Sequence, residues 1–295
     1  MPAQLEDLAP QLVQFVPSLL APVERSITLI KPGRARLPGL DNAALQLLRK
    51  KQIRLRALTT TTRTAAADLG PHVARALAST LIFAQQEAGT AVCIDSRGWI
   101  VTCAHCFGES PQEWRKQRYK WLLYYSGLAV QAECHVWDAR RDLALAKVIR
   151  MEWPEAQGHR LPRPDSVYWA TRADDLETAS SRKTDYDLVE ISQGRLRGMV
   201  PGADPHDNSD IGALKHDAWT YWGHSGAPLL RWADGTLVGL HSSWDDTTAM
   251  RHGVPLVAIR EFLRAHLPTE RIGLSLAPQG ASATEREIIV IDSSD

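Results

Sequence analysis

The sequence predicts a protein made mostly of short β-strands, folded as a barrel or a sandwich. Short apolar runs recur between turn signals from residue 80 onward, as is typical of closed or stacked antiparallel sheets. Strands and helices do not alternate regularly, which argues against a parallel sheet. The 295 residues, 44% of them hydrophobic, suffice for a large core in one two-lobed domain or two small domains.

Residues 1–70 are expected to form an N-terminal extension that carries no chemistry. The extension contains a loose helical periodicity, a β-like run, a short helix and a threonine-rich linker, at residues 5–20, 26–30, 43–48 and 59–64. Its one dense basic run, residues 49–56, is interpreted as a solvated helix end, although nuclear-import and nucleic-acid patches look similar. The extension could serve as a pro-segment, a regulatory or targeting arm, or a packing element.

The remaining elements follow from apolar runs bounded by glycine, proline and polar turns. Helices are predicted over residues 71–78 and 259–267, and strands over 80–84, 89–94, 99–102, 121–125, 128–137, 142–148, 188–191, 194–200, 228–230, 236–241 and 253–257. The turn at residues 95–98 indicates a hairpin. Residues 151–185 are polar and proline-rich, which predicts a long loop.

Charge and cysteine content exclude several classes of protein. Basic and acidic residues both number 34, so net charge gives no reason to expect a nucleic-acid or membrane-surface partner. Acidic Glu6 and Asp7 stand where a signal peptide is positive, and no stretch approaches ~18 apolar residues. The protein is therefore expected to be intracellular, cytoplasmic or nuclear, with free thiols at Cys93, Cys103, Cys106 and Cys134.

The first chemical signal is a serine between two glycines, in the stretch Gly223-His224-Ser225-Gly226. Glycine allows the backbone to turn sharply, so that successive N–H groups point the same way. This arrangement suits a nucleophile that has its own oxyanion hole. An ordinary glycine-rich turn is the alternative interpretation.

A serine hydroxyl needs a general base, and the base needs a group that holds its tautomer. The chain offers His105 at a strand end and Asp142 at a strand start, with Asp138 as a competing acid. The order His, Asp, Ser is that of the chymotrypsin type rather than of subtilisin or the α/β-hydrolases. The CxxC spacing of Cys103 and Cys106 lacks a second ligand pair, so no metal is expected.

Three motifs in this order resemble those of trypsin-like serine peptidases. Thr102-Cys103-Ala104-His105-Cys106 is similar to T-A-A-H-C, residues 142–145 to D-[IL]-A-L, and residues 223–228 to G-[DN]-S-G-G-P. The resemblance covers roughly residues 75–267 and is nearest to the HtrA-like and glutamyl-endopeptidase branch, without a PDZ domain. It implies an all-β fold of two six-stranded antiparallel barrels with a C-terminal helix, in a peptidase domain over residues 71–270. The N-terminal extension lies outside the resemblance and is expected to be partly helical.

The resemblance also implies roles for individual residues. Ser225 would be the nucleophile, His105 the general base and acid, and Asp142 the group that orients His105. The amides of Gly223 and Ser225 would form the oxyanion hole. Ser242 stands where the family has a serine that hydrogen-bonds the catalytic aspartate, and no metal or organic cofactor is required.

Specificity is predicted from a substrate pocket near the serine, formed by Trp219, Thr220, His241 and Ser242. Trp219 stands where trypsin has the aspartate that receives lysine or arginine, so a basic residue before the scissile bond (P1) is not expected. Thr220 and His241 stand where glutamyl endopeptidases bind a substrate carboxylate, which implies acidic P1 specificity. A backbone-bonded strand histidine is the alternative for His241, and Trp222 and Trp244 could narrow the pocket.

The segment over residues 271–295 is expected to be a flexible tail. Ile288, Ile289, Val290 and Ile291, followed by acidic and serine residues, resemble a SUMO-interacting motif, which adds a strand to a partner sheet. The alternative is an edge strand of the protein's own barrel. SUMO or a SUMOylated protein is therefore a predicted partner.

Taken together, these residues favour an intracellular serine endopeptidase that acts on a protein or peptide substrate. The competing hypothesis is a peptidase-like binding or scaffold module with weak or no turnover, recruited through the tail.

Overall fold

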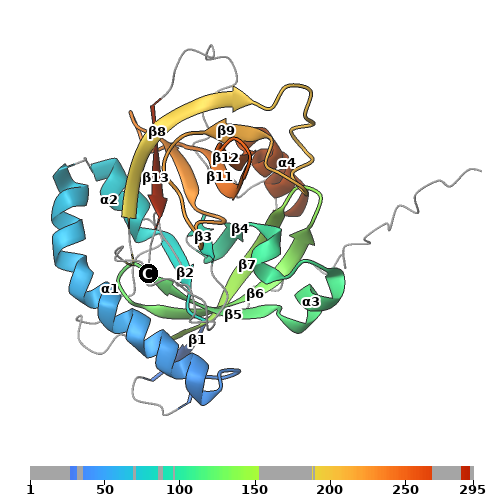
Figure 1. Ribbon diagram of the computed structural model, residues 1–295. Helices are drawn as coiled ribbons and strands as arrows, with labels where there is room; N and C mark the ends of the chain where they lie inside the picture. The colour runs from blue at the N-terminus through green and yellow to red at the C-terminus, as the bar shows by residue number, and fades with distance from the viewer. Residues whose placement is uncertain are drawn as a thin grey trace, which may run out of the picture.

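The computed structural model describes residues 27–31, 36–68, 71–85, 89–95, 97–152, 188, 190–267 and 287–292. The helical periodicity at residues 5–20 and nearly all of the loop predicted over residues 151–185 lie outside these ranges. In the part that is described, no helix is both long and apolar enough to span a bilayer. The strands form two barrels, side by side (Figure 1).

The first barrel contains six antiparallel strands: β2 (Thr80–Phe83), β3 (Thr90–Cys93), β4 (Trp99–Thr102), β5 (Tyr119–Tyr124), β6 (Ala129–Asp138) and β7 (Leu143–Glu152). Hydrogen bonding runs β2-β3-β4-β7-β6-β5 and returns to β2, which closes the ring. A short strand, β1 (Thr28–Ile30), joins β7 in parallel. The sequence places these strands to within a few residues because their apolar runs are bounded by clear turns.

Strand β7 shows how the first barrel is filled. Leu143 and Leu145 pack in one buried cluster, whereas Ala144 and Ala146 pack in another. Side chains alternate across a strand, so the large and small residues of this strand face opposite sides. Burial on both sides holds fixed the start of the strand, where Asp142 lies.

The second barrel is also closed and has six strands: β8 (Glu190–Met199), β9 (Leu214–His216), β10 (Pro228–Arg231), β11 (Leu237–Trp244), β12 (Arg251–Pro255) and β13 (Glu287–Asp292). The order around this barrel is β10-β11-β12-β9-β8-β13. Helix α4 (Leu256–His266) follows β12. The predicted two-barrel class with a C-terminal helix is confirmed, and the two strands predicted over residues 188–200 are one strand.

Strand β13 corrects the expectation of a flexible tail. Residues 287–292 pair antiparallel with β8 over their whole length, and Ile288, Ile289 and Val290 also pair with β10. Both edges of the segment are hydrogen-bonded within the protein, and a SUMO-interacting motif needs one free edge. The structure therefore does not support SUMO binding by Ile288–Ile291, and it agrees with the alternative of a strand in the protein's own barrel.

Helix α1 (Asn42–Asp68) corrects two expectations about the N-terminal region. Residues 59–64 are not a linker, because the helix continues through the threonines to residue 68 without a glycine or proline. Its basic run is not wholly solvated either. Lys51 is fully buried, and its ammonium group donates to the carbonyl of Phe83 at 2.9 Å.

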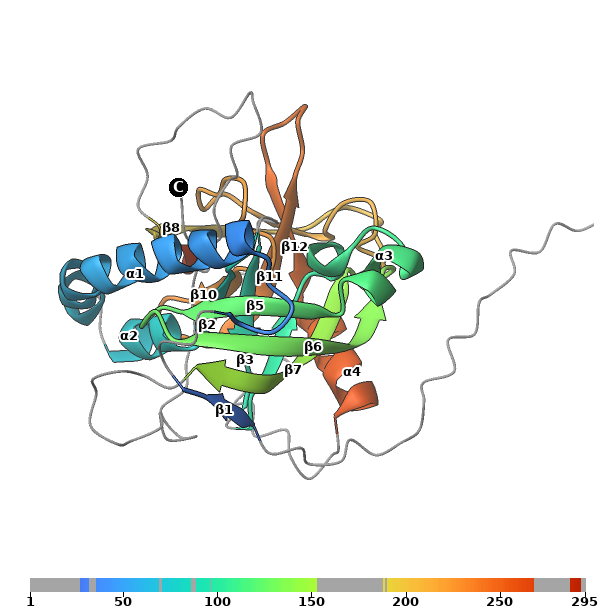
Figure 2. The same ribbon diagram turned by 90° about the horizontal axis from the view of Figure 1, so that it is seen from below.

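The helix is thus part of the first lobe's packing. Gln52 donates to the carbonyl of Gly127 at 2.9 Å, and Arg49 pairs with Glu152 at 2.6 Å. Helix α1 and helix α4 lie on opposite sides of the molecule (Figures 1 and 2). The predicted short helix α2 (Pro71–Ala78) follows α1 and contacts it.

Helix α3 (Pro111–Lys116) was not predicted. Ser110 caps it, since the hydroxyl oxygen accepts from the amide of Glu113 at 3.2 Å. A serine followed by proline, with glutamate three residues on, is a capping signal in the sequence. The signal could have located this helix, although the helix is short.

Candidate active site

A cavity of about 540 Å³ lies between the two barrels. It is lined by His105 and Asp142 from the first lobe and by Ser225 from the second. Other expected site residues also line it: Thr220, Gly223, His241, Ser242, Trp222 and Trp244. Trp219 and β13 do not contribute to this lining.

His105 is held by the end of β4. The strand ends at Thr102, whose hydroxyl donates to the carbonyl of Thr90 at 2.5 Å. The chain then enters the 3₁₀ turn Ala104–Phe107, which carries the imidazole. The indole N–H of Trp137 donates to the carbonyl of Ala104 at 2.9 Å and thereby anchors the turn to β6.

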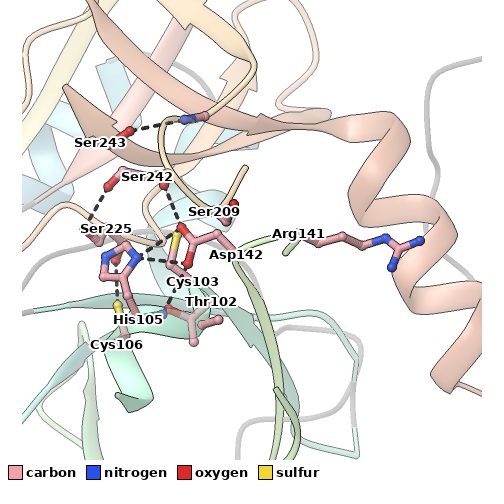
Figure 3. Close-up of polar contacts among 12 residues, drawn as sticks. Thr102, Cys103, His105, Cys106, Arg141, Asp142, Ser209, Ser225, Ser242 and Ser243 are labelled. Carbon is pink, nitrogen blue, oxygen red and sulfur yellow. Dashed lines mark hydrogen bonds and ion pairs between the residues drawn. The ribbon is translucent and has the colours of Figure 1, made fainter. Parts of the chain in front are cut away.

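Asp142 lies directly behind the imidazole. Nδ1 of His105 lies 2.9 Å from Oδ1 and 3.1 Å from Oδ2 of Asp142, and the His105 amide donates to Oδ1 at 3.2 Å. The Ser242 hydroxyl donates to Oδ2 at 2.6 Å (Figure 3). Asp138, the competing acid, instead accepts from the amide and guanidinium of Arg141.

The backbone of Asp142 has a positive φ of 50°. A non-glycine residue rarely adopts this conformation, and such strain concentrates at functional sites. The hydrogen bonds to the carboxylate, together with the buried strand that follows, hold it in place.

Electrostatic interactions favour an ionised Asp142 and a more basic His105. Burial alone would raise the pKa of the Asp142 carboxyl, but His105 and the hydrogen bonds from His105 and Ser242 outweigh burial and lower it. Burial alone would lower the pKa of His105, but Asp142 outweighs burial, and with Glu109 it raises this pKa above 6.5. An ionised carboxylate beside a basic imidazole is the arrangement a serine nucleophile needs.

Ser225 lies in a turn that only glycine can complete. Gly223 and Gly226 have φ of 95° and 88°. A Cβ on Gly226 would stand 2.0 Å from the carbonyl oxygen of Thr90. Thr90 also anchors the turn, since its amide donates to the carbonyl of Ser225 at 2.8 Å.

The Ser225 hydroxyl donates to the carbonyl of Ser242 at 3.1 Å. Within the described residues it makes no hydrogen bond to His105, whose ring lies in the same cavity. Catalytic hydrogen bonds are often long or misaligned without substrate, and a serine side chain reorients by rotation about χ1.

The amides of Gly223 and Ser225, expected to form an oxyanion hole, are available. The hydroxyl of Thr90 donates to the carbonyl of Gly223 at 2.9 Å, which holds the peptide between Gly223 and His224. No described residue accepts from the amides of Gly223 or Ser225, and both residues line the cavity. Two unpaired N–H groups beside a serine can stabilise a negative charge that develops on a substrate oxygen.

Replacing Ser242 by alanine should lower kcat about tenfold, because the Asp142 carboxylate loses a charge-assisted hydrogen bond. KM should change little, since the hydroxyl points to Asp142 rather than toward substrate. Steady-state kinetics on a peptide substrate measure both values. Ser242→Thr keeps the hydroxyl and should restore most of kcat; an equal loss in both variants would contradict this role.

The residues expected to determine specificity lie as a group on the second barrel. Thr220 and His241 are buried in the cavity wall, and Nδ1 of His241 lies 3.1 Å from Nε2 of His216. Trp219 stacks on Tyr221, with ring centroids 6.3 Å apart. Sequence reasoning missed His216, for which spacing gives no signal because β9 is distant from β11 in the chain.

Two indoles stand at the cavity rim. Trp222 is 69% exposed and Trp244 is 55% exposed. Exposed tryptophans are unusual on a free surface and frequent at binding sites. They border the cavity without filling it.

One group of side chains could donate to a metal ion. Sγ of Cys103, a ring nitrogen of His105 and a carboxylate oxygen of Asp142 all lie within 4.8 Å of one another. This sulfur, nitrogen and oxygen set matches donors that zinc accepts, but the three groups already have hydrogen-bond partners. The Cys103 thiol donates to the carbonyl of His241 at 3.3 Å, and Nδ1 of His105 faces Asp142. Cys106, the other half of the CxxC spacing, instead directs its thiol to the carbonyl of Ser225.

The two barrels and the His, Asp and Ser side chains between them define the architecture of a trypsin-like peptidase. Residues 89–240 match the family model described as trypsin-like peptidase domain. The match covers more than half of the 295 residues, so the chain belongs to this family of serine peptidases. No curated protein sequence matches the chain.

Proposed function

We propose that this protein is a serine endopeptidase that acts through Ser225, His105 and Asp142. The observation that carries the proposal is the bonding of Asp142, which accepts from His105 and Ser242. Asp142 lies near Ser225, whose own amide and that of Gly223 donate to no described residue. Peptide or protein segments are its substrates. The proposal also places the protein near the HtrA-like and glutamyl-endopeptidase branch of the family.

The chemistry follows from the positions of these groups. His105 takes the proton from the Ser225 hydroxyl as the oxygen attacks the scissile carbonyl. The amides of Gly223 and Ser225 bind the oxyanion, and Asp142 stabilises the imidazolium. His105 then gives the proton to the leaving amine, and water releases the acyl group from Ser225 by the same steps.

Location inside the cell is a further part of the proposal. Cys93, Cys103, Cys106 and Cys134 are all free and buried. Free thiols are typical of a reducing compartment. Imaging of the tagged full-length protein tests this, and a secreted product would contradict it.

Labelling with a fluorophosphonate probe tests the enzyme against the alternative of an inactive binding module. The probe reacts with an activated serine and needs no knowledge of the natural substrate. Labelling of the wild type at Ser225 supports the enzyme. Absence of labelling in a folded sample would favour the binding module.

The pH dependence gives a second test. Because the pKa of His105 is raised above 6.5, kcat/KM should rise with pH through a midpoint above 6.5 as His105 loses its proton. Replacing Glu109 by glutamine should lower that midpoint, because the carboxylate of Glu109 favours the imidazolium. Glu261→Gln, on α4, serves as the matched control. A midpoint unchanged in Glu109→Gln would contradict the assignment.

A further inference from the structure

Two polar atoms in the cavity wall, the hydroxyl of Thr220 and Nε2 of His241, make no hydrogen bond to any described residue. Thr220 is 5% exposed and His241 is 4% exposed. Neither atom is among the fully enclosed unpaired polar atoms of the described residues, and both residues line the cavity, so a polar group on an entering molecule can pair with them there.

His216 decides which atom of His241 is available. Nε2 of His216 lies 3.1 Å from Nδ1 of His241, and the rings meet edge to face. One of the two nitrogens donates and the other accepts, so Nδ1 is already used. Only Nε2 is left for a ligand, as a donor or an acceptor according to the tautomer.

The surroundings of His241 keep it uncharged. Burial lowers the pKa of His241 well below 6.5, and His216, His224, His105 and Arg251 all disfavour a positive ring. His216 is itself neutral, because burial and then Arg251 lower its pKa to about 3.

Among the residues that line the cavity, none is a lysine or an arginine. The lining carboxylates outside the His105 pair are Glu109 and Asp210, both exposed. The buried wall at Thr220 and His241 is therefore polar and carries no charge of its own.

We propose that Thr220 and His241, positioned by His216, form a P1 subsite for an uncharged carboxamide side chain, that of glutamine or asparagine. The inference rests on the proposed function and gives that site its substrate class. His241 and Thr220 are specificity residues, and His216 is a positioning residue.

The chemistry of the three candidate side chains separates them. A carboxamide has both a donor and an acceptor, so it pairs with a neutral imidazole in either tautomer and with a hydroxyl. A carboxylate at this site would be buried without a positive partner, and an ammonium or guanidinium group would be buried without a negative partner. Burying an unpaired charge is costly. The acidic P1 residue expected from the sequence is the competing prediction. The two predictions differ in that an acidic side chain requires a protonated His241, whereas a carboxamide pairs with the neutral ring.

The experiment compares matched peptides that differ only at P1. The wild-type protein is first labelled with the fluorophosphonate probe to establish an active Ser225. Values of kcat/KM are then measured at pH 8 for glutamine, asparagine, glutamate, lysine, phenylalanine and alanine at P1. A carboxamide should exceed glutamate, lysine and alanine at least ~10-fold, because a polar pocket rejects ligands that leave its groups unpaired.

Variants localise the preference. Thr220→Val should reduce the carboxamide-to-alanine ratio about tenfold with little effect on the alanine peptide. Thr236→Val, in the turn before β11 and outside the cavity lining, should leave the ratio unchanged. His216→Leu should weaken the same ratio through KM while probe labelling persists, and His216→Gln, which keeps a hydrogen-bonding side chain, should retain more of it.

The outcomes are distinguishable. Labelling together with a preference for glutamate or phenylalanine would overturn the carboxamide subsite and leave the peptidase intact. A carboxamide preference that survives Thr220→Val and His216→Leu would also overturn it. Absence of both labelling and cleavage would sink the proposed function itself.

Discussion

Replacing Ser225 by alanine should abolish peptide cleavage and fluorophosphonate labelling. The loss in kcat should be about four to six orders of magnitude, because the nucleophile of a triad acts as a unit with its base. The His105 and Asp142 pair does not depend on the serine hydroxyl, so it should remain intact. The remaining rate would come only from substrate binding and the oxyanion amides.

The folded state should tolerate this change. Among the described residues, the Ser225 hydroxyl makes one hydrogen bond, to the carbonyl of Ser242. Its removal should cost about 1 kcal/mol of unfolding free energy. Ser126→Ala, at an exposed turn, is the matched control. The Ser126 hydroxyl accepts from the amide of Leu128 at 3.4 Å, so the variant also loses one hydrogen bond but should leave kcat unchanged. Residual labelling of Ser225→Ala equal to the wild type would place the reactive serine elsewhere.

Deleting residues 287–292 should destabilise the second barrel and remove probe labelling. Strand β13 is hydrogen-bonded to β8 along six residues and to β10 along three. Without β13, one edge of β8 and one edge of β10 lose their partner. Each lost backbone hydrogen bond costs ~0.5–1.5 kcal/mol, so the free energy of unfolding should fall by more than about 3 kcal/mol. Thermal unfolding measures the stability, and the fluorophosphonate probe measures the site.

Labelling depends on β13 because of where β10 begins. Pro228, the first residue of β10, stands three positions after Ser225, so the strand fixes the nucleophile turn. Deletion of residues 293–295 alone is the matched control and should change neither measurement. A synthetic peptide of residues 285–292 should restore part of the labelling when added to the deletion variant. Full labelling of the variant without peptide would show that β13 is dispensable.

Strands bounded by clear turns, and site residues that stand within recognisable motifs, could be predicted from the sequence. His105, Asp142 and Ser225 were located because each is attached to a strand end of recognisable pattern. Helix α1 was predicted too short because threonine has modest helix propensity, and packing of Lys51 and Gln52 on the barrel overrides it.

Residues 287–292 were harder to assign for a physical reason. A β-branched run with an acidic flank can pair with any free sheet edge, whether in a partner or in its own chain. Only the three-dimensional position of β8 and β10 decides between them. The His216 contact to His241 likewise depends on strand pairing in space, through β12, which no local pattern encodes.

The position of β13 in the chain has a consequence for biosynthesis. The ribosome makes the first lobe, the Ser225 turn and α4 before it reaches residue 287. Until then β10 has one open edge, and the barrel that carries the nucleophile cannot close. Domains form in the order of translation where they can, and contacts between distant segments form late. Translation itself thus delays closure of the barrel that carries the Ser225 turn until residues 287–292 have been made.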